Sequence, residues 1–392
     1  MKTYFSEKTG NDVIIKVEGR IDTLNAAQFG AEVDRIHALY PDCMLHLDFL
    51  GTEYMTSCGL REIMRFIKSG YRFELFNVNQ DVYIVLSTTG MTEFVTARRR
   101  INKVDVTGCT VIGRGANGIV YKISDDTIVK VFFRANADID KILNERLLAK
   151  KALVAGVPTA ISFGLTEADG KPALIFELID AKSLSKLFGE DRGNIDKYVA
   201  DYVALVKKIH SIDPERLDYP VISQSEELLK KLETIRSLIG EEAAETLKEI
   251  ITSVSQEETL LHGDIQPNNV MATGGELLII DLDTMTKGVP LFDLAFLYRT
   301  LCIFRLFSSE EEEKAFLMFG SDTADALWSR FIRLYYEGES EEFIAETEKK
   351  CRAVGLLAIL SREVSRHGHT EMADRMTELL KEACADIGKL AG

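Results

Sequence analysis

The sequence predicts two folded parts: a small α/β module, followed by a larger α+β region in which strands give way to helices. Three observations support this division. The chain has 392 residues, more than the ~100–200 residues of a typical single domain. Strand and helix patterns alternate over the first hundred residues. After residue 108 strand-like runs gather around a glycine cluster, and from about Leu184 the pattern is mostly helical.

Composition excludes several classes of protein. Hydrophobic residues make up 46% and charged residues 28%, a balance typical of a folded soluble chain rather than a disordered one. No run approaches the ~18 consecutive apolar residues that a membrane helix needs, and the first residues lack the apolar core of a secretion signal. The six cysteines form no CxxC pair, which favours free thiols in a reducing compartment. We therefore expect a cytoplasmic protein.

The net charge of −15 is unevenly distributed. Residues 1–104 contain 13 basic and 13 acidic side chains, whereas the remainder contains 34 basic and 49 acidic ones and carries the whole excess. Such a surface repels nucleic acid and anionic lipid, so neither is an expected partner. The one dense basic run, Arg98 to Arg100 with Lys103 nearby, is interpreted as part of a solvated linker.

Within the first module, short β-rich runs alternate with stretches of helical apolar spacing. This alternation implies right-handed crossovers and a sheet covered by helices. Three strands are expected at 13–17, 43–49 and 73–78, and three helices at 25–39, 59–67 and from 82 onward.

The second region begins with a phosphate-binding pattern. Residues 113–120 read GRGANGIV and fit GxGxxGxV, in which Gly113, Gly115 and Gly118 would let backbone amides approach a polyphosphate. Alone the pattern also fits a dinucleotide fold or a tight turn. Because residues 119–123 continue as a strand rather than a helix, it favours a glycine-rich hairpin over a nucleotide.

Lys130 lies in the apolar strand 128–132, where an ammonium group needs an anionic partner to offset its desolvation. Glu145 follows in the helical stretch 139–155 and is placed to hold the lysine while the lysine holds phosphates. A surface ion pair is the open alternative for Glu145.

The strongest signal is residues 261–269, LHGDIQPNN, followed by IIDLD at 279–283. Asp264 can align an acceptor hydroxyl while Asn269, five residues later, binds Mg²⁺, and Asp281 at the end of a buried strand supplies a second metal contact. His262 is interpreted as a brace for this loop rather than an acid or base. Asp283 is assigned a supporting or capping role.

These residues resemble the aminoglycoside phosphotransferase and choline kinase branch of the kinase superfamily. The shared pattern is HGDxxxxN, then IDxD, then the Asp-Leu-Ala that begins here at Asp293. The resemblance covers roughly residues 108–305. It implies a two-lobed protein-kinase-like fold with ATP and Mg²⁺ as cofactors and an adenine-contacting hinge from Glu177 to Ile179. A small hydroxylated acceptor fits better than a protein, because the lysine two positions after Asp264, the APE triplet and room for a long activation segment are all missing.

The first hundred residues resemble a STAS domain, the fold of anti-sigma factor antagonists. The motifs are VEGRID at 17–22, MTSCGLR at 55–61 and TTGM at 88–91, with Thr56 and Cys58 departing from the usual residues. The resemblance implies an anti-sigma-type protein partner and a phosphorylation site at Ser57. Ser57 can instead cap the following helix.

The sequence thus predicts a STAS-like regulatory domain at 1–100, a basic linker at 101–107, and a kinase-like domain with its N-lobe at 108–180 and its helical C-lobe at 181–392. The expected function is an ATP- and Mg²⁺-dependent transfer of phosphate to a hydroxyl group, coupled to the first module. The alternative is an anti-anti-sigma regulatory protein whose kinase-like lobe is a sensor or a pseudokinase scaffold.

Overall fold

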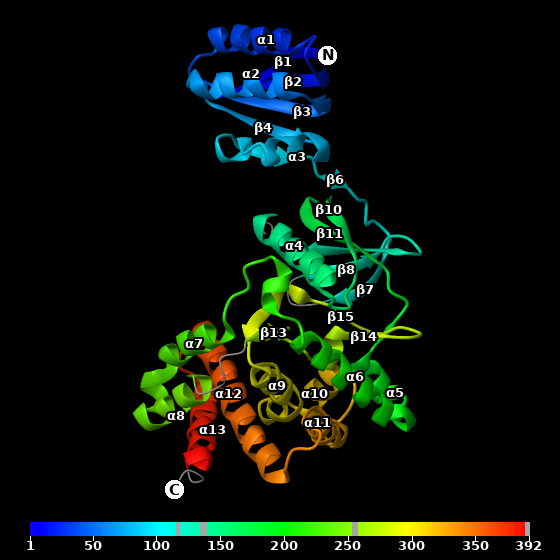
Figure 1. The fold of residues 1–392 in the computed structure, drawn as a ribbon, viewed down its shortest axis with the longest axis vertical. Coiled ribbons are helices and arrows are strands. Elements are labelled where there is room, and N and C mark those ends of the chain that lie inside the picture. Colours follow the sequence, from blue (N-terminus) through cyan, green and yellow to red (C-terminus); the bar gives the residue numbers. More distant parts are fainter. Residues whose placement is uncertain (115–117, 134–138, 253–257, 389–392) are drawn as a thin grey trace. The chain divides into compact units, whose positions relative to one another are not determined.

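The computed structural model describes residues 1–114, 118–133, 139–252 and 258–388 (Figure 1). The chain forms two compact units. Unit 1 comprises Met1–Asp105 together with Leu165–Asp169, and unit 2 comprises Val106–Gly164 together with Gly170–Gly392. No helix among the described residues is long and apolar enough to cross a membrane.

Unit 1 is built on a five-stranded sheet in the order β1-β2-β3-β4-β5. β1 runs antiparallel to β2, and the other neighbours are parallel. Buried side chains alternate along β2 at Val13, Ile15 and Val17, the period of a strand with one face in a core. The strands are β1 (Lys2–Thr9), β2 (Asp12–Ile21), β3 (Met44–Met55), β4 (Phe73–Val78) and β5 (Ala97–Arg99).

Three helices connect the strands of this sheet: α1 (Ala26–Leu39), α2 (Ser57–Lys68) and α3 (Gln80–Thr88). Their apolar faces share one core with the strands, in which Phe29 of α1 packs edge-to-face on Phe66 of α2. The predicted sheet with helices is therefore confirmed for this module. β1 was not predicted because most of its side chains are exposed and show no apolar alternation.

Unit 2 opens with antiparallel strands in the order β11-β9-β8-β7, and β10 lies on the other side of β11. β6 (Asn102–Lys103) pairs with Thr166 and Glu167 of β10, and all four of these residues belong to unit 1. The elements of this part are β7 (Thr110–Arg114), β8 (Gly118–Lys122), β9 (Thr127–Phe132), α4 (Ile139–Ala155), β10 (Ser162–Ala168) and β11 (Lys171–Glu177).

The rest of unit 2 is mainly helical, and its helices enclose a large apolar core (Figure 1). Two small sheets, β12-β14-β15 and β13-β16, interrupt the helices and carry the loops around residues 262 and 281. The helices are α5 (Leu184–Glu190), α6 (Ile195–His210), α7 (Gln224–Ile239), α8 (Glu241–Thr252), α9 (Pro290–Tyr298), the π-helical turn η6 (Arg299–Ile303), α10 (Glu310–Leu317), α11 (Ser321–Tyr335), α12 (Glu341–His367) and α13 (Glu371–Gly388). The short strands are β12 (Lys182–Ser183), β13 (Thr259–Leu261), β14 (Val270–Ala272), β15 (Leu277–Ile279) and β16 (Thr286–Gly288).

Candidate active site

Three residues predicted from separate segments meet at Lys130 of β9. Its Nζ lies 3.0 Å from Glu145 Oε1 on α4 and 2.8 Å from Asp281 Oδ1, just beyond β15. Only 16% of the lysine side chain is exposed. Burial disfavours the charged ammonium, but Asp281 and Glu145 outweigh it and raise the pKa of Lys130 above its ordinary value. The lysine is therefore held as a cation between two carboxylates.

The loop after β13 arranges Asp264 and Asn269 as a unit. Asp264 Oδ2 accepts hydrogen bonds from Gln266 Nε2 at 2.8 Å and from Asn269 Nδ2 at 3.0 Å. The same Asn269 nitrogen also donates to the Asp264 carbonyl oxygen at 2.9 Å. Because the amide nitrogen is engaged in this way, Asn269 Oδ1 is the atom that can serve a further ligand.

His262 and Asp293 anchor this loop from inside the core. The Asp293 carboxylate accepts the backbone N–H groups of His262 and Gly263 at 2.9 and 2.7 Å, and it lies 3.0 Å from His210 Nε2. His262 bonds the carbonyl oxygen of Ile280 through Nε2 at 3.1 Å and accepts the Asp264 N–H at Nδ1. Burial lowers the pKa of His262, which keeps the ring neutral. These contacts agree with the bracing role expected for His262.

Asp281 and Asp283 occupy the turn after β15. Asp281 has a φ of +66°, a left-handed conformation that costs a non-glycine residue of the order of 1 kcal/mol and is concentrated at functional sites. Surrounding protein atoms, then the charges of Asp281 and Glu145, raise the pKa of Asp283 to about 6, although the residue is exposed. Acidic charge is therefore concentrated beside Lys130.

The glycine motif includes the end of β7 and the start of β8, two strands that pair antiparallel. Gly113 lies in β7 and Gly118 begins β8, while Gly115 lies outside the described residues. A Cβ at Gly118 would stand 2.3 Å from the carbonyl oxygen of Val131, so only glycine permits this approach of β8 to β9. The hairpin predicted from the motif is present.

The expected hinge follows β11. Glu177 is its last residue, and Glu177 Oε1 accepts the backbone N–H of Ile161 at 2.7 Å. The Glu177 side chain therefore binds the backbone at Ile161. Any contact of the hinge with a nucleotide base would then be made by backbone N–H and C=O groups. Ile179 is half-buried in the loop that follows.

Comparison with known proteins identifies the family. The profile of the phosphotransferase enzyme family (APH) matches residues 108–324, more than half of the chain. The chain belongs to this family. The resemblance drawn from residues 262–269, 281–283 and 293 is therefore confirmed.

Solved structures agree on the fold of this phosphotransferase. The GDP and kanamycin complex of APH(2")-IIia is 14% identical, covers 77% of this chain and 99% of its own, and has a TM-score of 0.50. The GDP complex of a mutant aminoglycoside 2'-phosphotransferase-IIIa is also 14% identical, with 79% and 99% covered and a TM-score of 0.51. A choline/ethanolamine kinase family protein from Mesorhizobium loti is 16% identical, with 73% and 88% covered and a TM-score of 0.47. No curated protein sequence matches the chain.

Sequence reasoning did not assign roles to two positions of this phosphotransferase. Arg299 Nη2 lies 4.0 Å from Asp264 Oδ1, and His210 joins Asp293 to the hydroxyl of Tyr335. Asp293, the partner of His210, was already part of the sequence motif. It is the only charged residue of an otherwise apolar run from 289 to 297. A lone carboxylate in such a run requires buried donors.

Two expectations for unit 1 need correction. Thr56, not Ser57, caps α2, because the Thr56 hydroxyl accepts the N–H of Cys58; Ser57 is the exposed first residue of the helix. The basic run is also not wholly a linker, since Arg98 and Arg99 lie in β5. Arg98 pairs with Glu74 of unit 1 at 3.0 Å.

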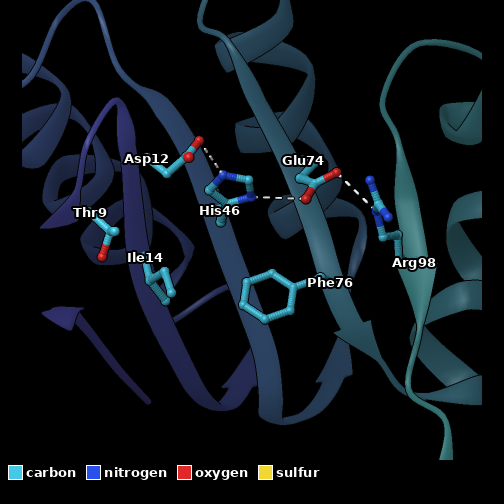
Figure 2. A pocket seen from close by; sticks show the side chains of 7 residues that line it. All are labelled: Thr9, Asp12, Ile14, His46, Glu74, Phe76 and Arg98. Carbon is cyan, nitrogen blue, oxygen red and sulfur yellow. Dashed lines mark hydrogen bonds and ion pairs between the residues drawn. The ribbon is translucent and has the colours of Figure 1, made fainter. Parts of the chain in front are cut away.

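A shallow groove of about 400 Å³ lies on the sheet of unit 1 (Figure 2). His46 at its centre bonds Asp12 at 2.9 Å through one ring nitrogen and Glu74 at 2.8 Å through the other. Burial opposes the protonated ring, but these two carboxylates together raise the pKa of His46 above its ordinary value. The Arg98 guanidinium extends the chain of charges at Glu74 (Figure 2).

Proposed function

We propose that the protein transfers the γ-phosphoryl group of ATP, with Mg²⁺, to a hydroxyl group of a small molecule. The observation that carries this proposal is that the Lys130–Asp281 pair and the Asp264–Asn269 pair lie on adjoining segments. The N–H of Ile280, next to Asp281, donates to the carbonyl oxygen of Asn269 at 2.9 Å. Phosphoryl transfer is catalysed mainly by positioning and charge stabilisation, and these groups supply both.

In this proposal Lys130 holds the α- and β-phosphates, and Glu145 orients the lysine. The backbone of the hairpin at Gly113, Gly115 and Gly118 covers the phosphates. The segment from Glu177 to Ile179 contacts the base. The 3.0 Å contact between Lys130 and Glu145 supports the first assignment, since the carboxylate fixes the position of the lysine ammonium.

The donor set fits Mg²⁺. Mg²⁺ prefers oxygen ligands and is usually held by one or two protein groups together with substrate phosphates. Asn269 Oδ1 and the Asp281 carboxylate are two such groups. When bound, Mg²⁺ would neutralise charge that develops on the phosphates.

Asp264 would orient the acceptor hydroxyl and take up its proton. The two amide groups that donate to Oδ2 fix the rotation of the carboxylate, so that Oδ1 is directed elsewhere. Asp293 would act as a positioning residue, because it holds the backbone on the N-terminal side of Asp264.

Unit 1 is proposed to be a STAS-like regulatory module with Ser57 as its phosphorylation site. Support comes from the exposure of Ser57 at the first position of α2, where helix N–H groups favour a phosphate. An anti-sigma-type protein is the proposed partner of this module.

Asp264→Asn in the full-length chain tests the enzymatic proposal. Turnover should fall at least 100-fold while ATP affinity changes less than threefold, since the side chain acts on the acceptor. Asp201→Asn, which removes a carboxylate from the exposed face of α6, is the matched control and should behave as wild type. Full turnover in Asp264→Asn would refute its role, and a large loss of ATP affinity would mean that the role is not confined to the acceptor.

A further inference from the structure

Arg299 places a positive charge beside the proposed acceptor group. Its Nη2 lies 4.0 Å from Asp264 Oδ1, and its guanidinium lies 4.8 Å from the centre of the Phe296 ring. Only 22% of the side chain is exposed. Burial lowers the pKa of Arg299, Asp264 raises it, and Arg362 lowers it further by repulsion. A second cation therefore acts on this arginine.

That second cation comes from α12, which packs closely on α9 and η6 (Figure 1). A Cβ at Gly355 would stand 3.2 Å from the carbonyl oxygen of Ala295 and 3.4 Å from Arg299 Cβ, so the glycine permits this approach. Arg362 lies seven residues later, two turns along the same face of the helix. Arg362 therefore lies on the same side of α12 as Gly355, and its side chain is exposed.

A third cation comes from α7, which packs on α12. Lys231 is half-buried and shares a helix face with the core residues Leu228 and Ile235. Burial, and then the charge of Arg299, lower the pKa of Lys231, and Glu227 opposes this only in part. Three helical elements therefore bring positive groups together around Arg299.

None of these three cations forms a close ion pair in the described part of the chain. Among the described residues, no carboxylate lies within 4.0 Å of Lys231 or Arg362, and Arg299 only just reaches Asp264 at that limit. By comparison, Arg236 contacts three glutamates, and Arg333 forms a bidentate ion pair with Glu341. Arg299 and Lys231 are partly buried, where an unpaired cation is costly, so the approach of further positive charge to Arg299 beside Asp264 indicates a site for an anion.

We propose that the acceptor carries an anionic group, a carboxylate or a phosphate, in addition to its hydroxyl, and that Lys231, Arg299 and Arg362 bind this group. The inference rests on the proposed phosphotransferase function and names its substrate class. In the reaction the acceptor oxygen forms a bond to the γ-phosphorus, and the bond from that phosphorus to the β–γ bridging oxygen breaks. ADP leaves with the electron pair, and the hydroxyl proton passes to Asp264. The anionic group of the acceptor is unchanged.

The test uses four sugar probes that share the glucose ring and differ in charge: glucose, glucosamine, glucuronate and glucose 6-phosphate. Binding of each to the full-length protein is measured by calorimetry in the presence of ADP and Mg²⁺, with ADP affinity determined in the same samples. The variants are Lys231→Met, which keeps the length of the side chain, Arg362→Gln, and the double substitution. Lys208→Met removes an exposed lysine from α6 and is the control.

We expect at least one of the two anionic probes to bind more tightly than glucose, and glucosamine to bind most weakly. Each substitution should weaken the anionic probe about tenfold, as loss of one charged contact does, and the control should leave it unchanged. Tighter binding of glucuronate would assign a carboxylate, and tighter binding of glucose 6-phosphate a phosphate.

No preference for an anionic probe, or equal binding by the double variant, would overturn the inference. The proposed function would still stand if ADP binds with Mg²⁺ in those samples. Absence of Mg²⁺-dependent nucleotide binding by the wild type would instead refute the function on which the inference rests.

Discussion

Replacing Asp293 by asparagine tests whether one buried carboxylate positions the loop that carries Asp264. Asp293 is fully buried and accepts three hydrogen bonds, from the backbone N–H groups of His262 and Gly263 and from His210 Nε2. Burial raises the pKa of Asp293, but the hydrogen bond and charge of His210, and then His262, outweigh burial and lower the pKa below its ordinary value. Asparagine has nearly the same shape but only one acceptor oxygen, so its NH₂ group must face at least one donor.

The expected loss of stability follows from the number of hydrogen bonds that the asparagine cannot accept. Losing one charge-assisted hydrogen bond and leaving its donor buried and unpaired costs about 3 kcal/mol. Unfolding entropy is about 2.1 cal/mol/K per residue, so for a unit of roughly 280 residues this corresponds to a drop in Tm of about 5 °C. Displacement of the loop backbone should also lower turnover at least 100-fold, since misplacement by ~1 Å is sufficient for such a loss.

The assay combines calorimetric unfolding with ATP turnover and ATP affinity in the full-length chain. We expect lower stability and lower turnover together. ATP affinity measured with a chelator in place of Mg²⁺ should stay within threefold of wild type, because Lys130 and the hinge lie outside the displaced loop. Asp201→Asn is again the control. An Asp293→Asn protein with unchanged Tm and unchanged turnover would refute the positioning argument.

Three further predictions concern other parts of the chain. Lys130→Met should weaken ATP binding at least tenfold without unfolding the protein, as measured by calorimetry; unaltered affinity would remove the lysine from the nucleotide site. Gly118→Ala should destabilise unit 2 by about 1–3 kcal/mol in denaturant unfolding, since its Cβ would press on Val131, and a neutral effect would contradict the close strand approach. The ring of His46 should titrate above its ordinary pKa of 6.5 in NMR, and Glu74→Gln should lower that pKa. The stabilisation due to His46 is then present below about pH 6.5 and is lost as pH rises through the raised pKa; a His46 pKa at or below 6.5 would contradict it.

Two elements were predicted to the residue. The strand Phe73–Val78 and the helix Ile139–Ala155 match the expected limits. β1 could not be predicted, because its pairing with β2 stabilises it while its own side chains remain largely exposed. The cap of α2 was misplaced by one residue, since threonine and serine are both good caps and only backbone geometry distinguishes Thr56 from Ser57.

Some residues of the candidate site could likewise be predicted from the sequence, and others could not. Lys130 and Asp264 could be found because each belongs to a local pattern with a chemical meaning. Arg299 could not, because its contact with Asp264 spans 35 residues and depends on the turn of η6 after an apolar helix. The grouping of Lys231 with Arg362 depends on the packing of α7 and α12, which no local pattern encodes.

The central claim is that Asn269 and Asp281 hold a metal that accompanies a nucleotide phosphate donor. The most direct measurement is the affinity of the full-length protein for ATP, with Mg²⁺ and with a chelator, in wild type and in Asp281→Asn. Wild type should bind ATP at least tenfold more tightly with Mg²⁺, and the substitution, which removes charge with little change of volume, should abolish that difference and with it Mg²⁺-dependent transfer while leaving the fold intact. Equal ATP affinity of the wild type with and without Mg²⁺, or unchanged Mg²⁺-dependent turnover in Asp281→Asn, would contradict the account.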